Sequence, residues 1–177
     1  MKLGSEKDFV KVYESFALVK KEIIRLSRMV EGVLAISSMQ ELSHSNTEIN
    51  VRDVIYGSVE AYRALSEKRS NTLRLTVTDT LPKISVGAEA LVQMITNLLT
   101  NANAHTENGE ISVLCECDRA GATLKISITD NSAGIPPDLL PKVFERGVTG
   151  SSGSGYRLSI CRELARSNGG DVTVEST

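Results

Sequence analysis

Three short stretches of the sequence carry side chains that could bind a metal-bound nucleotide. Asn97 and Asn101 are four residues apart, Asp130 follows a run of alternating aliphatic residues, and Gly153-Ser154-Gly155 precedes a helical pattern. Side-chain amides are hard oxygen donors of the kind that Mg²⁺ accepts beside substrate phosphates. A carboxylate at a strand end can accept a hydrogen bond from an adenine amine, and the free N–H groups of a helix start favour phosphate oxygens.

Each stretch has an ordinary alternative interpretation when it is taken alone. An Asn in a helix is most often a surface residue, an Asp after a strand often opens a turn, and a Gly- and Ser-rich stretch can be a flexible linker. Gly134, four residues after Asp130, supports a ligand site because glycine permits close approach of the backbone. The combination of all three stretches therefore favours a magnesium-nucleotide site. A P-loop is excluded, because no glycine-plus-lysine pattern follows an early strand.

The hydrophobic pattern predicts the elements that would position these side chains. A helix over Gly87–His105 would place Asn97 and Asn101 one turn apart on a common side. Alternating residues from Ile111 to Ile128 predict a β-hairpin that ends at Asp130. A further helix is predicted from about Tyr156 to Ser167, ending at Gly169-Gly170.

The remaining pattern completes an α/β domain. We predict a short strand at residues 48–50, a helix over 51–68, a strand through Leu73, Leu75 and Val77, a short helix from Pro136-Pro137 to about Glu145, and a final strand beginning at Val172–Val174. The expected fold class is therefore a two-layer α/β sandwich, in which a mixed sheet has helices on one face. Residues 51–177 would form this domain, with residues 41–50 as a linker and first strand.

Residues 1–40 predict a long, coiled-coil-like helix. Its apolar residues recur at alternating spacings of three and four, which is a heptad seam, and they are Phe9, Val12, Phe16, Val19, Ile23, Leu26, Val30 and Val33. A seam of this length favours pairing with another helix. Packing of the seam against the chain's own domain remains the alternative.

Composition excludes several classes of partner. The 177 residues carry a net charge of −2 without a basic stripe, which argues against nucleic-acid binding. No apolar run is long enough to cross a bilayer and no signal peptide is evident, so we expect no direct membrane contact and a cytoplasmic location. Cys115, Cys117 and Cys161 lack zinc spacing and are expected to be small core residues.

In order and spacing, the three stretches resemble the N, G1 and G2 boxes of the sensor histidine kinases. Val143-Phe144-Glu145-Arg146 resembles the family's F box, and Ile24–Val30 resembles the closing helix of its dimerisation hairpin. The resemblance covers about residues 9–176 and implies the Bergerat (GHKL-type) fold with ATP and Mg²⁺ as cofactors. Gln93 supports this choice, because the related ATPases place a water-activating Glu there and an amide cannot act as that base.

The resemblance also implies which residues form the site. Asn97 and Asn101 would lie near the metal, Asp130 would bind adenine, and residues 135–155 would form a lid. The implied ATP-binding residues are Asn97, Asn101, His105, Asp130, Gly134, Ile135, Gly153, Gly155, Tyr156, Arg157 and Leu158. No catalytic residue is expected, because neither His44 nor His105 lies in a phosphoacceptor helix of the family's kind.

The implied function is transfer of the ATP γ-phosphoryl group to a histidine on a helix absent from this sequence. Relay to an aspartate of a response regulator receiver domain would follow, in a parent protein that is a homodimer through the N-terminal helix. We expect the sequence to be part of a longer sensor kinase, with the family's last strand missing after Ser176, and the fragment alone not to autophosphorylate.

Three positions depart from the family pattern. Ser132 and Arg157 replace glycines of the G1 and G2 boxes, and Ala104 replaces a phosphate-facing cation. We therefore expect either that Arg157 resupplies the cation or that the chain is a degenerate module that binds nucleotide weakly, or not at all, and acts through protein–protein contacts. A serine kinase of the anti-sigma type on the same fold is a further alternative, although it has no use for the heptad helix.

Overall fold

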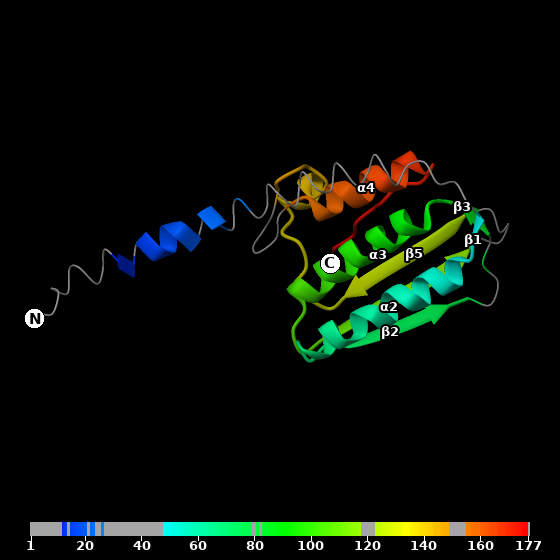
Figure 1. The fold of residues 1–177 in the computed structure, drawn as a ribbon, viewed down its shortest axis with the longest axis horizontal. Coiled ribbons are helices and arrows are strands. Elements are labelled where there is room, and N and C mark those ends of the chain that lie inside the picture. The colour runs from blue at the N-terminus through cyan, green and yellow to red at the C-terminus, as the bar shows by residue number, and fades with distance from the viewer. Residues whose placement is uncertain are drawn as a thin grey trace, which may run out of the picture.

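The computed structural model describes the following residues: 12–13, 15–20, 22–23, 26, 48–78, 81, 83–117, 123–148 and 155–176. Its sheet and helices form two layers (Figure 1). The three-stranded sheet has the order β2-β4-β5, from β2 (Thr72–Val77), β4 (Glu110–Cys117) and β5 (Leu124–Asp130). The helices α2 (Val51–Glu67), α3 (Ala88–His105) and α4 (Arg157–Ser167) complete the domain.

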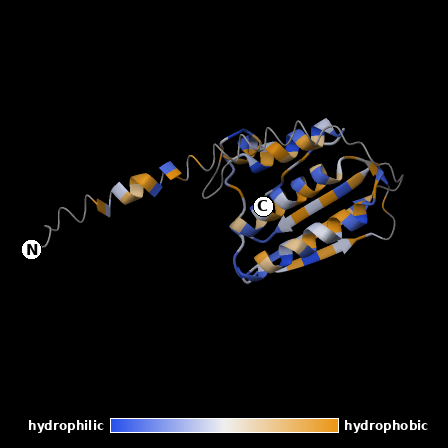
Figure 2. Cartoon of the chain, in the orientation of Figure 1, coloured by the Kyte–Doolittle hydropathy of each residue, from blue (hydrophilic) through white to orange (hydrophobic). Residues whose placement is uncertain are grey.

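The sheet is mixed, as predicted. Strand β2 runs parallel to β4, with Leu73 opposite Ile111, whereas β4 and β5 are antiparallel, with Val113 opposite Ile128. A separate antiparallel pair joins β1 (Glu48–Ile49) to β3 (Ile84–Ser85). Side chains alternate between the two faces of a strand, and Figure 2 shows the resulting alternation of hydrophobic and hydrophilic residues along the strands.

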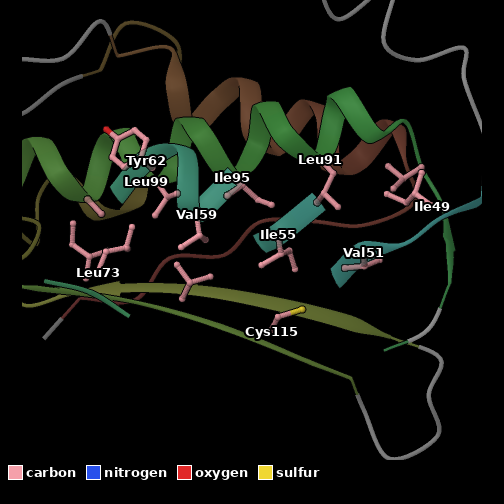
Figure 3. Packing of buried hydrophobic residues seen from close by; sticks show 14 residues of the cluster. Ile49, Val51, Ile55, Val59, Tyr62, Leu73, Leu91, Ile95, Leu99 and Cys115 are labelled. Carbon is pink, nitrogen blue, oxygen red and sulfur yellow. The ribbon is translucent and has the colours of Figure 1, made fainter. Parts of the chain in front are cut away.

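The core lies between the sheet and the pair α2 and α3 (Figure 3). Ile55 and Val59 come from α2, Ile95 and Leu99 from α3, and all four have at most 1% of their surface exposed. The spacing of four residues in each helix places these side chains on one face. Cys115 meets them from β4. Helix α3, which carries Asn97 and Asn101, is therefore held against the sheet that carries Asp130.

A buried polar cluster fixes the end of α3 to the start of β4. The Asn71 amide donates to Asn103 Oδ1 at 2.8 Å and to the Thr106 carbonyl at 2.9 Å, and Asn71 Oδ1 accepts from Gly109 N at 3.0 Å. Asn71 and Asn103 are both buried. Because a buried polar group left without a partner is costly, this cluster specifies where the last turn of α3 ends.

Two predicted elements were wrong. The expected helix over Pro136–Glu145 is only a 3₁₀ turn, η1 (Leu140–Lys142), because three prolines in this segment lack the N–H groups that a longer helix needs. The expected strand at Val172–Val174 is not formed. The Asp171 side chain accepts the Val172 N–H at 2.8 Å, a local bond that competes with strand pairing. Strand β3 was not predicted.

The N-terminal segment is helical at every position that the structure describes there, from Val12 to Leu26. The rest of the predicted helix and linker, residues 1–11 and 27–47 together with four intervening positions, lies outside the described residues. No helix within the described part of the chain combines the length and apolar character needed to cross a membrane.

Among the residues that the structure describes, two apolar surfaces stay exposed. The first is the seam of the N-terminal helix, where Phe16 is 69% and Ile23 is 58% exposed. The second is a groove of about 600 Å³ between α2 and α3, lined by Asp53, Val54, Gly57, Ser58, Ala61, Tyr62, Leu65, Val92, Thr96 and Thr100. Figure 1 shows the seam helix, in blue, well away from the sheet and its helices.

Candidate nucleotide site

Asn97 lies in the middle of α3, where the structure gives it two polar neighbours. Gln93, one turn earlier, donates from Nε2 to Asn97 Oδ1 at 3.2 Å. Asn97 Nδ2 is buried and has no hydrogen-bond partner at ordinary distance and angle, although the amide lies beside the thiol of Cys161 on α4. An amide oxygen has two lone pairs, so Oδ1 keeps one acceptor position for a ligand.

Asn101 and His105 follow Asn97 at intervals of four residues and therefore share its side of α3. Asn101 is half-buried, whereas His105 is exposed as the last residue of the helix. Ala104 is half-buried in the same final turn. The predicted alignment of the two asparagines on one helix side is thus present in the structure.

Asp130 ends β5, as the alternating pattern predicted. Its Oδ1 accepts a hydrogen bond from Ser132 N at 3.1 Å, which forms a tight turn after the strand. The Asn131 side chain binds the start of β4 instead, where its oxygen accepts a hydrogen bond from Glu110 N at 2.9 Å. The Asp130 carboxylate is half-buried, and its second oxygen, Oδ2, takes no part in this turn.

Gly134 has a φ of +76°, a backbone conformation that favours glycine. The sequence suggested close approach of a ligand as the reason for glycine here, and the structure supplies a conformational reason. The next residue, Ile135, donates its N–H to Ser176 Oγ at 2.7 Å. This bond holds the turn after β5 against the last described residues of the chain.

The glycine-rich approach to α4 is described from Gly155 onward, and Gly153 lies outside the described residues. Gly155 has a φ of +74°, and its carbonyl accepts from Gly147 N at 3.0 Å. Tyr156 caps α4 without a side-chain hydrogen bond. The first N–H groups of α4 therefore have no side-chain cap, and the half-buried Arg157 and Leu158 begin the helix.

Helix α3 connects the three parts of the candidate site. It packs against β5, which carries Asp130, and against α4, which begins at Arg157. The amides of Asn97 and Asn101 are thus carried by the element that contacts both others. Two oxygen donors on one helix face fit Mg²⁺, because this ion takes few protein ligands and completes its octahedron with water and phosphate.

Sequence patterns did not reveal the contact between Asn97 and Cys161. Burial raises the pKa of the Cys161 thiol to about 12, and the Asn97 amide opposes this shift. The thiol donates to the Met94 carbonyl, with Sγ 3.7 Å from the oxygen. No local signal could have paired these residues, because 64 positions separate Asn97 from Cys161.

A cluster of ion pairs around α4 was also missed. Arg146 forms a forked pair with Glu163, with Nη2 2.6 Å from Oε1 and 2.8 Å from Oε2. The Arg162 guanidinium lies 4.5 Å from the centre of the Phe144 ring. Arg162 also binds Asp171, and this hydrogen bond holds the pKa of that carboxyl well below its usual range. The stretch that resembles the F box is therefore attached to α4.

A sequence profile described as histidine kinase-, DNA gyrase B- and HSP90-like ATPase matches residues 86–177, more than half of the chain. The chain belongs to this family. Its matched region begins just before α3 and contains every predicted site residue. Within the ATPase family, the expected relationship to the catalytic domain of the sensor histidine kinases is confirmed by the relatives described next.

Sensor histidine kinase ZraS of Escherichia coli K12 is 32% identical over 161 residues, which cover 90% of this chain and 34% of ZraS. Sensor histidine kinase TrcS of Mycobacterium tuberculosis H37Rv is 28% identical over 173 residues, covering 92% of this chain and 34% of TrcS. The chain thus spans about a third of the length of these curated relatives.

Solved structures confirm the expected two-layer fold. The mycobacterial sensor histidine kinase MprB matches with a TM-score of 0.61 and 27% identity, covering 70% of this chain and 80% of MprB. Full-length ShkA in complex with AMPPNP shares the fold at a TM-score of 0.70 and 21% identity, over 99% of this chain and 38% of ShkA. ThkA in complex with the response regulator protein TrrA does so at 0.66 and 20%, over 96% and 47%.

Proposed function

We propose that this chain is the ATP-binding catalytic part of a sensor histidine kinase, which transfers the ATP γ-phosphoryl group to a histidine for relay to a response regulator. The observation that carries the proposal is the pair of amides, Asn97 and Asn101, on one side of α3, where Asn97 lies beside Cys161 of α4. The binding of AMPPNP by ShkA supports ATP as the nucleotide.

The residues have distinct roles in this proposal. Asn97 and Asn101 would hold Mg²⁺, which neutralises phosphate charge when bound. Asp130 would accept from the adenine amine, and the uncapped N–H groups at the start of α4 would bind phosphate oxygens. His105, Gly134, Ile135, Gly153, Gly155, Tyr156 and Leu158 would line the nucleotide.

Transfer would rely on positioning rather than on covalent chemistry by the domain. Gln93 stands where a base would activate water, and its amide instead donates to Asn97. An amide cannot remove a proton from water, so hydrolysis would not compete with transfer. The acceptor would be a histidine other than His44 and His105.

Calorimetry with ADP, in the presence of Mg²⁺ and of EDTA, tests the nucleotide site. We expect Mg²⁺ to strengthen ADP binding and Asn97→Ala to remove that increment, while Thr96→Ala, which alters the groove side of the same helix, retains it. Asp130→Ala should reduce the preference for ADP over GDP. Failure of the wild-type chain to bind ADP at millimolar concentration would contradict the proposal.

That failure would favour a second candidate, a module that has lost nucleotide binding and acts through protein contacts. This candidate rests on the three departures from the family pattern, at Ser132, Ala104 and Arg157, all of which the structure describes.

If the parent protein is active, its bound phosphate should be acid-labile, as expected for phosphohistidine. Acid-stable phosphate would indicate a serine kinase instead.

The proposed partners are a response regulator receiver domain and a second copy of the parent protein. The complex of ThkA with TrrA supports the first. The exposed apolar seam of the N-terminal helix supports the second, because seams of this spacing pair with other helices. A cytoplasmic location stays a prediction.

A further inference from the structure

The Asn97 amide lies between two side chains on different helices. Gln93 Nε2 donates to its oxygen from one side at 3.2 Å. On the other side the buried Nδ2 lies by the Cys161 thiol, which is itself fully buried. An amide can usually be rotated by half a turn without changing its shape, so its orientation depends on these neighbours.

The direction of the contacts is set by a backbone carbonyl. Met94 O can only accept, so the Cys161 S–H at 3.7 Å must donate to it. The sulfur then presents its lone pairs to Asn97, and a nitrogen rather than an oxygen must face it. This leaves Asn97 Oδ1 turned toward Gln93, whose amide supplies the matching donor.

The consequence for a cation is direct. With this orientation one lone pair of Oδ1 accepts from Gln93 and the other can coordinate a metal ion. With the reverse orientation the amide would direct N–H groups at the metal, and these would repel it. Orientation of one amide therefore decides whether Asn97 attracts or repels Mg²⁺.

We infer that Gln93 and Cys161 are positioning residues, which together fix the Asn97 amide with its oxygen available to a metal ion. The inference rests on the proposed role of Asn97 in holding Mg²⁺. Gln93 acts from one turn earlier on α3, a spacing at which Gln and Asn side chains meet. Cys161 acts from α4 and links this helix to the metal ligand.

The test is the ratio of ADP dissociation constants measured in EDTA and in Mg²⁺. Gln93→Met keeps the chain length but removes the donor, and Cys161→Ala removes the sulfur. Each should lower the ratio by about threefold to tenfold, the effect of one lost hydrogen bond, while ADP affinity in EDTA stays near the wild-type value. A purely structural role would weaken ADP binding equally in both conditions.

Two further variants serve as controls. Cys161→Ser keeps a group that both donates and accepts hydrogen bonds, so this variant should retain the wild-type ratio. Cys115→Ala removes another fully buried thiol, on β4, and should leave the ratio unchanged. If Cys161→Ala does not fold, as judged by circular dichroism, Gln93→Met decides the question.

The outcomes separate this inference from the proposed function. If Mg²⁺ does not strengthen ADP binding to the wild-type chain, the proposed function fails first. If it does, and Asn97→Ala removes the effect while Gln93→Met and Cys161→Ala keep the wild-type ratio, the positioning role is overturned and the proposed function stands.

Discussion

Ala104 and Arg157 are two residues whose effects we expect to be linked. Ala104 occupies the last turn of α3 at a position where the histidine kinases usually have a cation, and Arg157 is the first residue of the helix α4 that packs on α3. A guanidinium offers a forked set of donors that suits phosphate. Arg157 could therefore replace the missing cation from the opposite element.

Arg157→Gly should weaken Mg-ADP binding by about tenfold, because a charge-assisted hydrogen bond to phosphate is lost. Isothermal calorimetry would measure the change, and Arg157→Lys, which keeps the charge but not the fork, should retain part of the affinity. Tighter binding by the glycine variant, which restores the family's usual residue, would show that Arg157 obstructs the site.

Cys161 should make stability depend on pH in the alkaline range. Burial raises its pKa from 9.0 to about 12 in the folded chain, so the unfolded chain loses the proton first as pH rises. The thiol's contribution is complete below pH 9.0 and is lost between 9.0 and about 12, at up to about 1.4 kcal/mol per pH unit.

Urea unfolding across this range would measure the effect as a difference between the wild-type chain and Cys161→Val. Other groups titrate in the same range in both proteins and cancel in that difference. Parallel stability curves for the two chains would contradict the prediction.

At the scale of elements, the sequence predicted those with a strong internal period. Helices α2 and α3 follow from apolar residues every three or four positions, and β4 and β5 from strict alternation. The two-residue strand β3 is too short to show an alternating pattern. The strand expected at Val172–Val174 is not formed, because the Asp171 side chain accepts the Val172 N–H that strand pairing would use. A single local hydrogen bond of this kind is not visible in the hydrophobic pattern.

The features of the candidate site likewise divide into local ones, which the sequence predicted, and contacts between elements, which it did not. The alignment of Asn97 with Asn101, and the position of Asp130 at a strand end, are local properties of a helix and a strand. The contacts of Asn97 with Cys161 and of Arg146 with Glu163 join separate elements. These contacts arise from tertiary packing, so no spacing in the sequence could predict them.

Substitutions at Gly147 and Gly155 test how closely the backbone after η1 packs against the backbone before α4. Both have positive φ, but a Cβ on Gly147 would meet nothing within 4 Å, whereas one on Gly155 would lie 2.6 Å from the Gly147 carbonyl carbon. Gly147→Ala should cost about 1 kcal/mol of backbone strain. Gly155→Ala should cost about 1–3 kcal/mol more, from overpacking.

Chemical denaturation of both variants would measure these costs, with Gly169→Ala as a further control that has positive φ and open space. Equal destabilisation by the substitutions at Gly147 and Gly155 would show that the close approach of the two glycines is not maintained in solution.

For the whole molecule, the exposed apolar surfaces predict association through the N-terminal helix. The wild-type chain should show twice its 19.1 kDa mass in light scattering at tens of micromolar protein. Phe16→Glu combined with Ile23→Glu should give the monomer, because charges would enter the seam. Val92→Glu, which alters the groove between α2 and α3, should leave the dimer intact.

A monomeric wild-type chain would contradict helix pairing. Loss of the dimer in both the seam and the groove variants would indicate a different dimer, in which the seam of one copy occupies the groove of another.

The hydrogen bond from Gly147 N to the Gly155 carbonyl also bears on how this molecule could be altered or could diverge. Both of its groups belong to the backbone, so a substitution at either position can alter this bond only through the backbone conformation. Sequence divergence could therefore change the neighbouring side chains without losing the bond, provided that positions 147 and 155, which both have positive φ, keep glycine or another residue that tolerates this conformation.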